Sequence, residues 1–434
     1  MHIENNGFET VFNFEDYMDL PPILKLDVMI DKSKLKTVLY AANTAGTTKV
    51  VFTDTEPEDG SFNFKDLAIS DKSVYPGSLY SVTNGDTLYI YPNANGSTIY
   101  APEDCSSLFY EYYNLTNIDL SKLNTSKVTD MNNMFYNCYG LISLNVSKFD
   151  TSNVIDMSSM FDSCRALTSL DVSKFDTSNV TSMGSMFYDC SSLSSLDVSN
   201  FNTSKVTRMS SIFYNCNKLT SLNVSNFDTS KVTDMGGMFN ACSNLTSLDV
   251  SNFDTSNATS ISGMFCACSK LTNIDVSNFN TSKVTNMFNL FYECNKLTRL
   301  DLSNFDTKNV TSMMCMFDGC SALTSLDLSN FNTSNVTDMR QMFERCNALT
   351  SLNISSFNTS KVTDMNDMFN SCKSLTSLDL SSFDISKVTN MNDMFNVCTS
   401  LSTLYVQDSA TRRKLSTYAN IPNTCTIIIG SPSN

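Results

Sequence analysis

Cysteines and acidic residues, two residue types that can do chemistry, recur along this chain at one fixed interval. Eleven cysteines form an evenly spaced row: Cys138, Cys164, Cys190, Cys216, Cys242, Cys268, Cys294, Cys320, Cys346, Cys372 and Cys398. An acidic row keeps the same interval: Asp119, Asn145, Asp171, Asp197, Asn223, Asp249, Asp275, Asp301, Asp327, Asn353 and Asp379. Thiolates act as nucleophiles and metal ligands, and carboxylates bind Ca²⁺. These rows therefore suggest three possible chemistries: catalysis, metal binding and cation binding.

The partners that catalysis would need are missing. The only histidine is His2, which argues against a Ser-His-Asp triad, a Cys-His dyad and a histidine zinc site. Two carboxylates can hydrolyse glycosides, but they need different environments, and the carboxylates of the acidic row look alike from unit to unit. We therefore predict that the chain is not an enzyme and holds no cofactor.

The cysteine row is interpreted as part of a core. Its members end segments of the form MFxxC, and each faces the same residue type one unit along. Buried thiols are one interpretation. Disulfides are the alternative, and they require Cα separations of about 4.4–6.8 Å. We favour buried thiols, because each cysteine follows apolar core residues.

The repeating unit contains two different periodicities. One unit, from Leu193 to Leu219, reads LSSLDVSNFNTSKVTRMSSIFYNCNKL. Apolar and polar residues alternate over 193–201, which predicts a short strand with Asp197 on its outer side. Apolar residues over 206–216 follow helical spacing, which predicts one short helix.

Stacking of these units decides the fold class. Eleven whole units cover residues 115–400 without an insertion. A strand and a helix of this size cannot bury their apolar faces alone, so successive units must stack. We predict an α/β repeat solenoid, a rod with one parallel strand and one short helix per 26-residue unit, and with identical phenylalanines, methionines and cysteines stacked in its core.

Segments without the repeat are expected to close the two ends. Residues 73–114 predict β-hairpins with turns at Asn84-Gly85 and Asn95-Gly96, forming an N-terminal cap where the repeats start. Residues 401–434 predict a C-terminal cap with a helix around 411–418 and a strand at 426–429. Residues 1–72 share none of the repeat. Their segments 35–42 and 48–54 suggest a small β-containing unit that could serve as an anchor.

Charge and hydropathy limit the partners. The formal net charge of the 434 residues is −15, and no basic run occurs, so we expect no nucleic-acid binding. No run of about 20 apolar residues occurs, so we expect no membrane insertion. The N-terminal sequence is acidic where a signal peptide is basic and then apolar. We therefore expect no signal peptide, and a cytoplasmic location or another route of export or release.

Candidate binding residues are those that interrupt the repeat or form its outer row. Tyrosines crowd the first two units and are frequent at binding hot spots, although they could also complete the cap. The acidic row could attract Ca²⁺ or a basic partner, or serve as a solvated face that keeps the sheet soluble. The candidates are Tyr110, Tyr113, Tyr136, Tyr139, Asp197, Asp249, Asp275, Arg299 and Asp301.

The unit also carries a family resemblance. The pattern LxxLxVxxF-D/N-TSxVTxMxxMFxxC resembles the leucine-rich repeats of the BspA-like surface-protein family, over about two thirds of the chain. The resemblance implies a curved, non-catalytic scaffold on a cell surface or outside the cell. It also implies adhesion to a protein or glycan on another cell surface. A lipobox cysteine and a wall-anchoring tail are not evident in this sequence.

Two functions remain as expectations. The first is a surface-exposed protein that mediates adhesion or protein-protein interaction. The alternative is a phage virion structural or host-attachment protein, which needs no signal peptide because lysis releases it. Repeated positions specify the scaffold, so the residues that depart from the repeat are expected to carry recognition.

Overall fold

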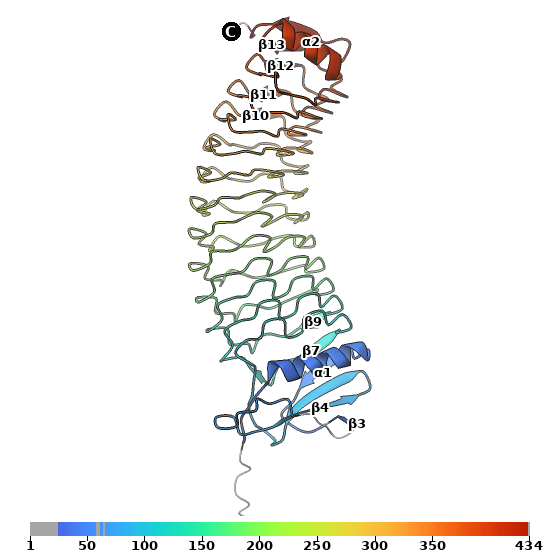
Figure 1. Ribbon diagram of the computed structural model, residues 1–434, viewed down its shortest axis with the longest axis vertical. Helices are drawn as coiled ribbons and strands as arrows, with labels where there is room; N and C mark the ends of the chain where they lie inside the picture. Colours follow the sequence, from blue (N-terminus) through green and yellow to red (C-terminus); the bar gives the residue numbers. More distant parts are fainter. Residues whose placement is uncertain (1–24, 58–60, 64–65, 433–434) are drawn as a thin grey trace, which may run out of the picture.

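The chain forms a curved rod of stacked coils, closed at each end by a segment with a helix (Figure 1). This computed structural model describes residues 25–57, 61–63 and 66–432. Each coil is one repeat unit, and parallel bridges join every coil to the next from Asp104 to Asn390. The fold is therefore a β-rich repeat. Among the described residues only two helices occur, α1 (Lys32–Thr44) and α2 (Ser409–Tyr418).

A six-stranded sheet begins the rod. Its strand order is β3-β4-β5-β2-β7-β9, with bounds β3 (Ser61–Asn63), β4 (Leu79–Asn84), β5 (Thr87–Pro92), β2 (Lys49–Phe52), β7 (Asn117–Asp119) and β9 (Ser143–Leu144). β2 pairs in parallel with β5 on one side and with β7, in the first repeat, on the other. The boundary expected at residue 72 therefore lies inside a continuous sheet, and residues on both sides of it form one cap.

One of the two expected hairpins is present. β4 and β5 pair antiparallel around Gly85, whose φ of +58° suits glycine in a tight turn. The second expectation was wrong. Gly96 has a φ of +73° and turns the chain, but the following strand β6 (Ile99–Tyr100) joins a separate parallel sheet. That sheet has the order β1-β6-β8, with β1 (Val28–Met29) and β8 (Leu123–Asn124).

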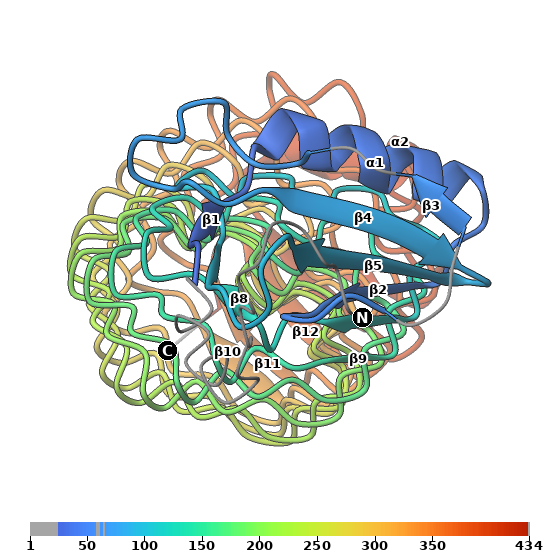
Figure 2. The ribbon, with the colours of Figure 1, turned by 90° about the horizontal axis from the view of Figure 1, so that it is seen from below.

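α1 lies across the open end of the rod (Figure 2). The Asp31 carboxylate accepts hydrogen bonds from the backbone N–H groups of Ser33 and Lys34, which caps the helix N-terminus. Leu35, Leu39 and Ala42 are buried. Segment 35–42, which suggested β structure, is thus a helix, because its buried residues follow helical rather than alternating spacing.

The core of the rod consists of stacked identical residues. Twelve phenylalanines from Phe109 to Phe395 form one column, with neighbouring ring centroids 5.3–6.0 Å apart and nearly parallel ring planes. Burial alternates as expected, with Leu193, Leu196 and Val198 buried and Asp197 exposed. Each column buries apolar side chains that a single coil would leave in water.

The expected continuous parallel sheet is only partly present. The leucine segments pair as strands near the two ends of the rod, in β7, β9, β10 (Ser325–Asp327), β11 (Ser351–Asn353), β12 (Ser377–Leu380) and β13 (Thr403–Val406). Between residues 145 and 324 they keep their burial pattern but do not pair as strands. The phenylalanine column is also widest there, at 6.0 Å, against 5.3 Å at both ends. Neighbouring rings are 5.7 Å apart both where β10 and β11 pair and in coils whose leucine segments do not pair, so ring spacing alone does not decide the pairing.

The expected helix in each unit was wrong. In the second coil, the N–H groups of Met131, Asn133 and Phe135 donate to carbonyls of the next coil over distances of 2.9 Å. The intervening N–H groups of Met134 and Tyr136 donate within the coil, to the carbonyls of Met131 and Asn133. An α-helix would direct every one of these bonds within its own segment. The segment is instead a row of turns, and its N–H groups donate alternately to carbonyls within the coil and to carbonyls of the next coil.

Left-handed residues explain why this segment is not a helix. Asn133 and Asn137 have φ of +55° and +59°, and the equivalent positions of the other coils share this conformation. A residue in this region ends a right-handed helix. Two such residues in each coil keep the Met, Met, Phe and Cys side chains on one face. The spacing therefore imitates a helix without forming one.

Buried hydroxyls and thiols satisfy further carbonyls between coils. Thr307 is 1% exposed; its hydroxyl donates to the Asn332 carbonyl at 3.0 Å and accepts from the Asn332 N–H at 2.8 Å. The Cys242 thiol donates to the Phe213 carbonyl at 3.1 Å, and burial raises its pKa to about 12. The other cysteines of the row make the same contact and are free thiols. The prediction of buried thiols is confirmed.

The C-terminal cap matches its prediction. α2 covers the last coil, and its Lys414 ammonium donates to the carbonyls of Ile385 and Val388. β14 (Thr426–Ile429) continues the sheet β12-β13-β14 in parallel. Within the part of the chain that the structure describes, no helix is long and apolar enough to cross a membrane.

Relief of backbone strain at Val397 is expected to stabilise the rod. Val397 is exposed and has a φ of +57°, a conformation that β-branched residues rarely adopt and that asparagine tolerates. Val397→Asn should raise the free energy of unfolding by about 1 kcal/mol, measured by urea denaturation. Val74, also exposed but outside the left-handed region, is the control, and Val74→Asn should give no such gain. Equal effects at both positions would contradict the strain.

Loss of one buried hydroxyl is expected to destabilise the stack. Thr307→Val removes the hydroxyl that accepts from the Asn332 N–H and donates to the Asn332 carbonyl, two hydrogen bonds that are partly buried. The free energy of unfolding should fall by about 1–3 kcal/mol in urea titrations. Thr307→Ser keeps the hydroxyl and should lose clearly less. Equal losses of unfolding free energy in Thr307→Ser and Thr307→Val would contradict the assignment of the loss to the hydroxyl's hydrogen bonds.

Candidate binding edge of the repeats

The positions that follow each phenylalanine of the core column differ from coil to coil. We call this row the variable edge; its members are Tyr110, Tyr136, Asp162, Tyr188, Tyr214, Asn240, Cys266, Tyr292, Asp318, Glu344, Asn370 and Asn396, together with the residue that follows each of them. The columns on either side of it are nearly uniform. Residues can vary here because their side chains lie at the end of the turns, outside the core columns.

Four predicted tyrosines form two stacked pairs in the first two coils, one pair on the variable edge (Tyr110 and Tyr136) and one just beyond it (Tyr113 and Tyr139). The rings of Tyr110 and Tyr136 are 4.9 Å apart, and those of Tyr113 and Tyr139 are 5.5 Å apart. Tyr110 is 43% exposed and Tyr113 is 46% exposed, so one face of each pair is available. The guanidinium of Arg165 lies over the ring of Tyr139, 4.9 Å from its centroid. The structure thus brings all four residues together, with a cation on the far side of one pair.

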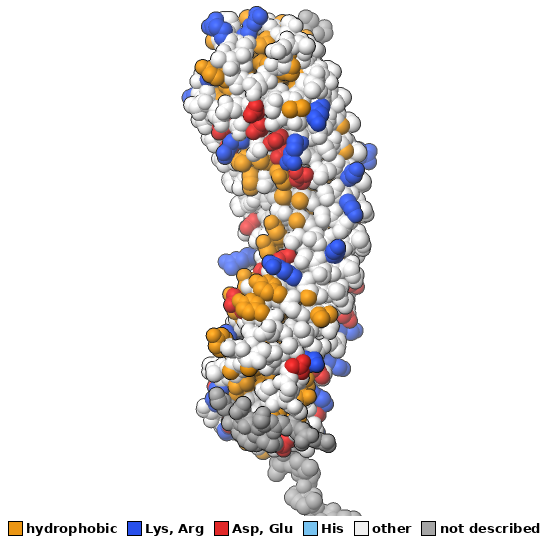
Figure 3. Space-filling model, turned by 90° about the vertical axis from the view of Figure 1, so that its right-hand side faces the viewer, with side chains coloured by type: hydrophobic (Ala, Val, Ile, Leu, Met, Phe, Trp, Pro, Cys, Tyr) orange, Lys and Arg blue, Asp and Glu red, His pale blue; other side chains and the backbone are white. Residues whose placement is uncertain are grey.

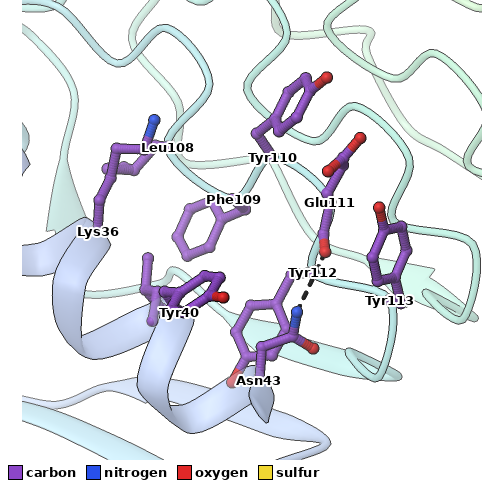
Figure 4. Close-up of a pocket in the computed structure, with 10 residues that line it drawn as sticks. Lys36, Tyr40, Asn43, Leu108, Phe109, Tyr110, Glu111, Tyr112 and Tyr113 are labelled. Carbon is purple, nitrogen blue, oxygen red and sulfur yellow. Dashed lines mark hydrogen bonds between the residues drawn. The ribbon is translucent and has the colours of Figure 1, made fainter.

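A cleft separates the first coil from α1 (Figure 4). Its volume is about 240 Å³, and Lys36, Tyr40 and Asn43 of α1 line it opposite Tyr110 and Tyr113. Tyr40 is 76% exposed, so a third aromatic ring borders the opening.

The Glu111 carboxylate lies between Tyr110 and Tyr113 and points away from α1, whereas the Glu111 carbonyl points toward Asn43 of α1 (Figure 4). Its backbone is held on both sides: its N–H donates to the Tyr136 carbonyl at 2.8 Å, and its own carbonyl accepts from the Asn43 side chain at 3.1 Å. Desolvation, followed by the neighbouring Glu111 carboxylate, raises the pKa of Tyr110. Both effects disfavour ionisation of Tyr110, so this tyrosine remains a neutral hydrogen-bond donor.

A second cluster on the variable edge was missed by sequence reasoning. Arg345 forms ion pairs with Asp318 at 2.8 Å and with Glu293 at 2.5 Å, and its guanidinium lies 5.7 Å from the ring centroid of Tyr292. The three partners come from the two preceding coils. The available signal was that Glu293 and Arg345 occupy equivalent positions of the repeat, two whole units apart.

A third cluster contains a buried carboxylate. Asp162 is 8% exposed, and desolvation raises its pKa to about 6. The Ser163 hydroxyl donates to it at 2.9 Å. The neighbouring Asp189 accepts from Arg165 at 2.5 Å and from Asn215 at 2.7 Å. Asp162 therefore differs from Asp189, because only Asp189 bonds directly to a cation.

The acidic row has a local structural role. Asp197 is exposed, and its carboxylate accepts from the N–H of Ser199 at 3.0 Å and from its hydroxyl at 2.6 Å. The same contacts recur in Asp249 and Asp275. Asp301 accepts from the Ser303 N–H. These hydrogen bonds lower the pKa values of the four carboxyls. The row closes turns after the leucine segments.

Arg299 is the last of the predicted binding residues, and metal binding is the last of the predicted chemistries. Arg299 is exposed and, within the described residues, forms none of the ion pairs found. It stands apart from the tyrosines, on the leucine segment. Among the described residues no three metal-ligating side chains converge. The structure therefore does not bring the predicted residues into one site: the tyrosines cluster, and the carboxylates remain a row.

One side of the rod carries a distinct arrangement of hydrophobic and charged side chains. Figure 3 shows one side on which hydrophobic side chains follow a column along the rod, with acidic and basic side chains gathered beside it. The chain is otherwise covered largely by uncharged polar groups on that side. Such a combination of aromatic and charged groups is typical of binding surfaces.

Comparison with known proteins identifies one family. The family described as "Mycoplasma protein of unknown function, DUF285" matches residues 103–222, 193–299, 268–353 and 319–414. The overlapping matches follow the repeats from the first coil to the C-terminal cap. No curated protein and no solved structure shows a significant match.

Ionisation of Asp162 is expected to make stability depend on pH. Its folded pKa is raised to about 6, above the ordinary value of 3.8 for an aspartate, so its favourable contribution is complete below pH 4 and is lost as the pH rises through 6. Asp162→Asn should remove this loss and raise the free energy of unfolding above pH 6 by roughly 1–3 kcal/mol. Urea titrations at pH 4 to 7.5 measure it.

Asp197→Asn is the control for this prediction. Ser199 lowers the pKa of Asp197, so its contribution changes with pH in the opposite direction. If Asp162→Asn and the unmodified chain show the same pH profile, burial of Asp162 does not shift its ionisation.

Proposed function

We propose that this chain, which belongs to the family described as Mycoplasma protein of unknown function, DUF285, is a non-catalytic binding protein displayed on a surface. Its partner would be a protein or a glycan of another cell. The repeats supply a long regular scaffold, and the variable edge supplies the contacts. This is the adhesion function that the resemblance to BspA-like proteins implies.

The repeat architecture supports the finer assignment to leucine-rich-repeat solenoids of the BspA-like type. Each coil buries leucines at equivalent positions, such as Leu193 and Leu196, and stacks in parallel on the next coil with equivalent residues in register. The rod is open-ended and needs the caps at α1 and α2. The unit differs from a strand-helix repeat in having turns in place of the helix.

The single observation that carries the proposal is the pair of exposed tyrosine stacks in the first two coils. Tyr110 and Tyr113 expose almost half of their surface beside a cleft, although the same coils bury apolar rings such as Phe109 completely. Tyrosines of this kind offer a large rigid surface with a polar tip, at a small loss of conformational entropy. A scaffold that needed only stability would bury them or replace them with small polar residues, as several other coils do.

A binding screen with a matched pair of variants tests this function. The full chain, biotinylated, is applied to arrays of extracellular-matrix proteins and of cell-surface glycans. We expect specific retention on at least one array. The double variant Tyr110→Ser and Tyr113→Ser should reduce that signal at least about tenfold, because hot-spot tyrosines carry much of the binding energy.

Tyr418→Ser is the control for the screen. Tyr418 is 59% exposed on α2, at the opposite end of the rod, and its loss should leave binding unchanged. Circular dichroism and the urea midpoint must show that all variants fold. Absence of retention by the unmodified chain, or equal loss in both variants, would contradict the proposed function.

A further inference from the structure

We propose that the cleft between α1 and the first coil is a groove for an extended segment of a partner protein, whose backbone N–H groups donate to the carbonyls of Leu108 and Tyr110. This inference rests on the proposed function and names the class of partner that this end of the rod recognises. It depends on two hydrogen bonds that every later coil accepts and the first coil does not.

In every later coil, the two carbonyls at these positions accept N–H groups of the preceding coil. The Met134 carbonyl accepts from Phe109 at 2.9 Å, and the Tyr136 carbonyl accepts from Glu111 at 2.8 Å. Equivalent bonds recur along the rod, over 2.9–3.1 Å at the first position and 2.6–2.9 Å at the second. Both carbonyls of each coil therefore point toward the N-terminal end of the rod.

The first coil has no coil before it, and α1 lies in that place (Figure 2). Among the residues that the structure describes, no donor reaches the carbonyls of Leu108 and Tyr110. Because the stack keeps one geometry, both carbonyls point toward α1, and both residues line the cleft. A buried carbonyl without a partner costs free energy, and Leu108 is 2% exposed. The cleft therefore holds two hydrogen-bond acceptors that lack donors.

α1 is fixed to the first coil on both sides of the cleft. Near its N-terminus, Lys32 donates to the Ser106 hydroxyl at 2.8 Å and pairs with Asp104 at 2.7 Å. Near its C-terminus, Asn43 donates to the Glu111 carbonyl at 3.1 Å. Between these contacts the helix and the coil enclose a volume of about 240 Å³. The groove is therefore formed before a ligand arrives, which reduces the entropic cost of binding.

The groove combines an apolar floor with an aromatic rim. Leu39 and Phe109 are buried at its floor, whereas Tyr40 and Tyr113 are 76% and 46% exposed at its rim. An extended chain directs alternate N–H groups to one edge and its side chains to the two faces. Such a segment can donate to both carbonyls while one of its apolar side chains enters between the rings. Addition of an extended segment to an open backbone edge is an established mode of peptide recognition.

Charge contributes little inside the groove. The Glu111 carboxylate points away from α1, and the side chain of Lys36 extends toward Leu108 (Figure 4). Lys36 is exposed and forms none of the ion pairs found among the described residues, so its flexible side chain is free to move aside. Backbone and apolar contacts are thus expected to provide most of the affinity, and an uncharged peptide is a suitable probe.

The test titrates a capped, uncharged pentapeptide, Thr-Val-Leu-Val-Thr, into the isotope-labelled full chain and follows it by triple-resonance NMR. The N–H signals of Phe109 and Glu111 report the carbonyl carbons of the residues before them. We expect the carbonyl resonances of Leu108 and Tyr110 to move downfield as they accept hydrogen bonds. The Met134 carbonyl, which already has its donor, is the internal control and should not move.

Two N-methylated peptides test which edge of the backbone binds. One lacks the N–H groups of its second and fourth residues, and the other lacks those of its third and fifth. Only one edge can face the carbonyls, so one of these peptides should bind at least about tenfold more weakly than the other. Serine in place of the central leucine should also weaken binding about tenfold, because the apolar contact is lost.

Tyr40→Ser tests the rim of the groove. It should weaken binding of the unmodified peptide about fivefold, because an aromatic wall of the groove is removed. Tyr418→Ser is the matched control, since Tyr418 is an exposed tyrosine on the helix of the other cap and should not affect binding. Thermal unfolding of both variants checks that the fold is intact.

Unmoved carbonyl resonances of Leu108 and Tyr110 would overturn this inference, as would equal affinities of the two N-methylated peptides. Both results leave the proposed function to the array screen with the variants of Tyr110 and Tyr113. Retention of the chain on glycans alone would support adhesion and overturn the peptide groove. Failure of the array screen together with the expected carbonyl shifts would instead reject adhesion and keep the groove.

Discussion

Backbone hydrogen bonds from each coil to the next are the interaction on which this structure depends. Along the turn segment, every second N–H group points to the neighbouring coil, as in the bonds from Asn133 to the Ser158 carbonyl and from Phe135 to the Met160 carbonyl. Left-handed residues such as Asn137 make this alternation feasible. Once these bonds are set, every residue lies on its equivalent in the next unit. Columns of phenylalanine, methionine and cysteine are then the packing that buries each apolar side chain.

The fold was predictable where a rule depends on spacing alone. The constant interval between equivalent residues gave the stacked units, alternation gave the buried leucines, and the C-terminal segment gave α2 and β14. The helix in each unit was not predictable in this way. Side chains at positions such as Met131, Met134 and Phe135 share one face in a helix and equally in a row of turns with left-handed residues. Gly, Asn and Ser at the left-handed positions were the available signal, but Gln, Arg and Val occupy some of these left-handed positions.

The candidate site was predictable where residues depart from the repeat. The tyrosines of the first coils stood out for that reason, and the structure brings them together. Asp197 and its equivalents were chosen because they are charged and periodic, but their carboxylates bond to the serines that follow them in the same turn. The cluster of Arg345 could not be found from single residues, because it combines three coils. Variable residues can meet when their coils lie close together in the rod, although the residues are far apart in the sequence.

Recognition in such a rod follows from the same constraint that stabilises it. A core column tolerates little change, because each side chain packs on its own equivalent. The variable edge lies past the phenylalanine column, so a residue there contacts its neighbours in nearby coils of the rod. Glu293 finds a guanidinium two coils away, and the rod uses the contact internally. In the first coils Ser163 stands in place of Arg345 and Tyr136 in place of Asp318, and the ring of Tyr136 stacks on Tyr110, so the same positions hold aromatic rings there instead of an internal ion pair. The same positions of the repeat can therefore join coils or present exposed rings, depending on the residues that neighbouring coils place beside them.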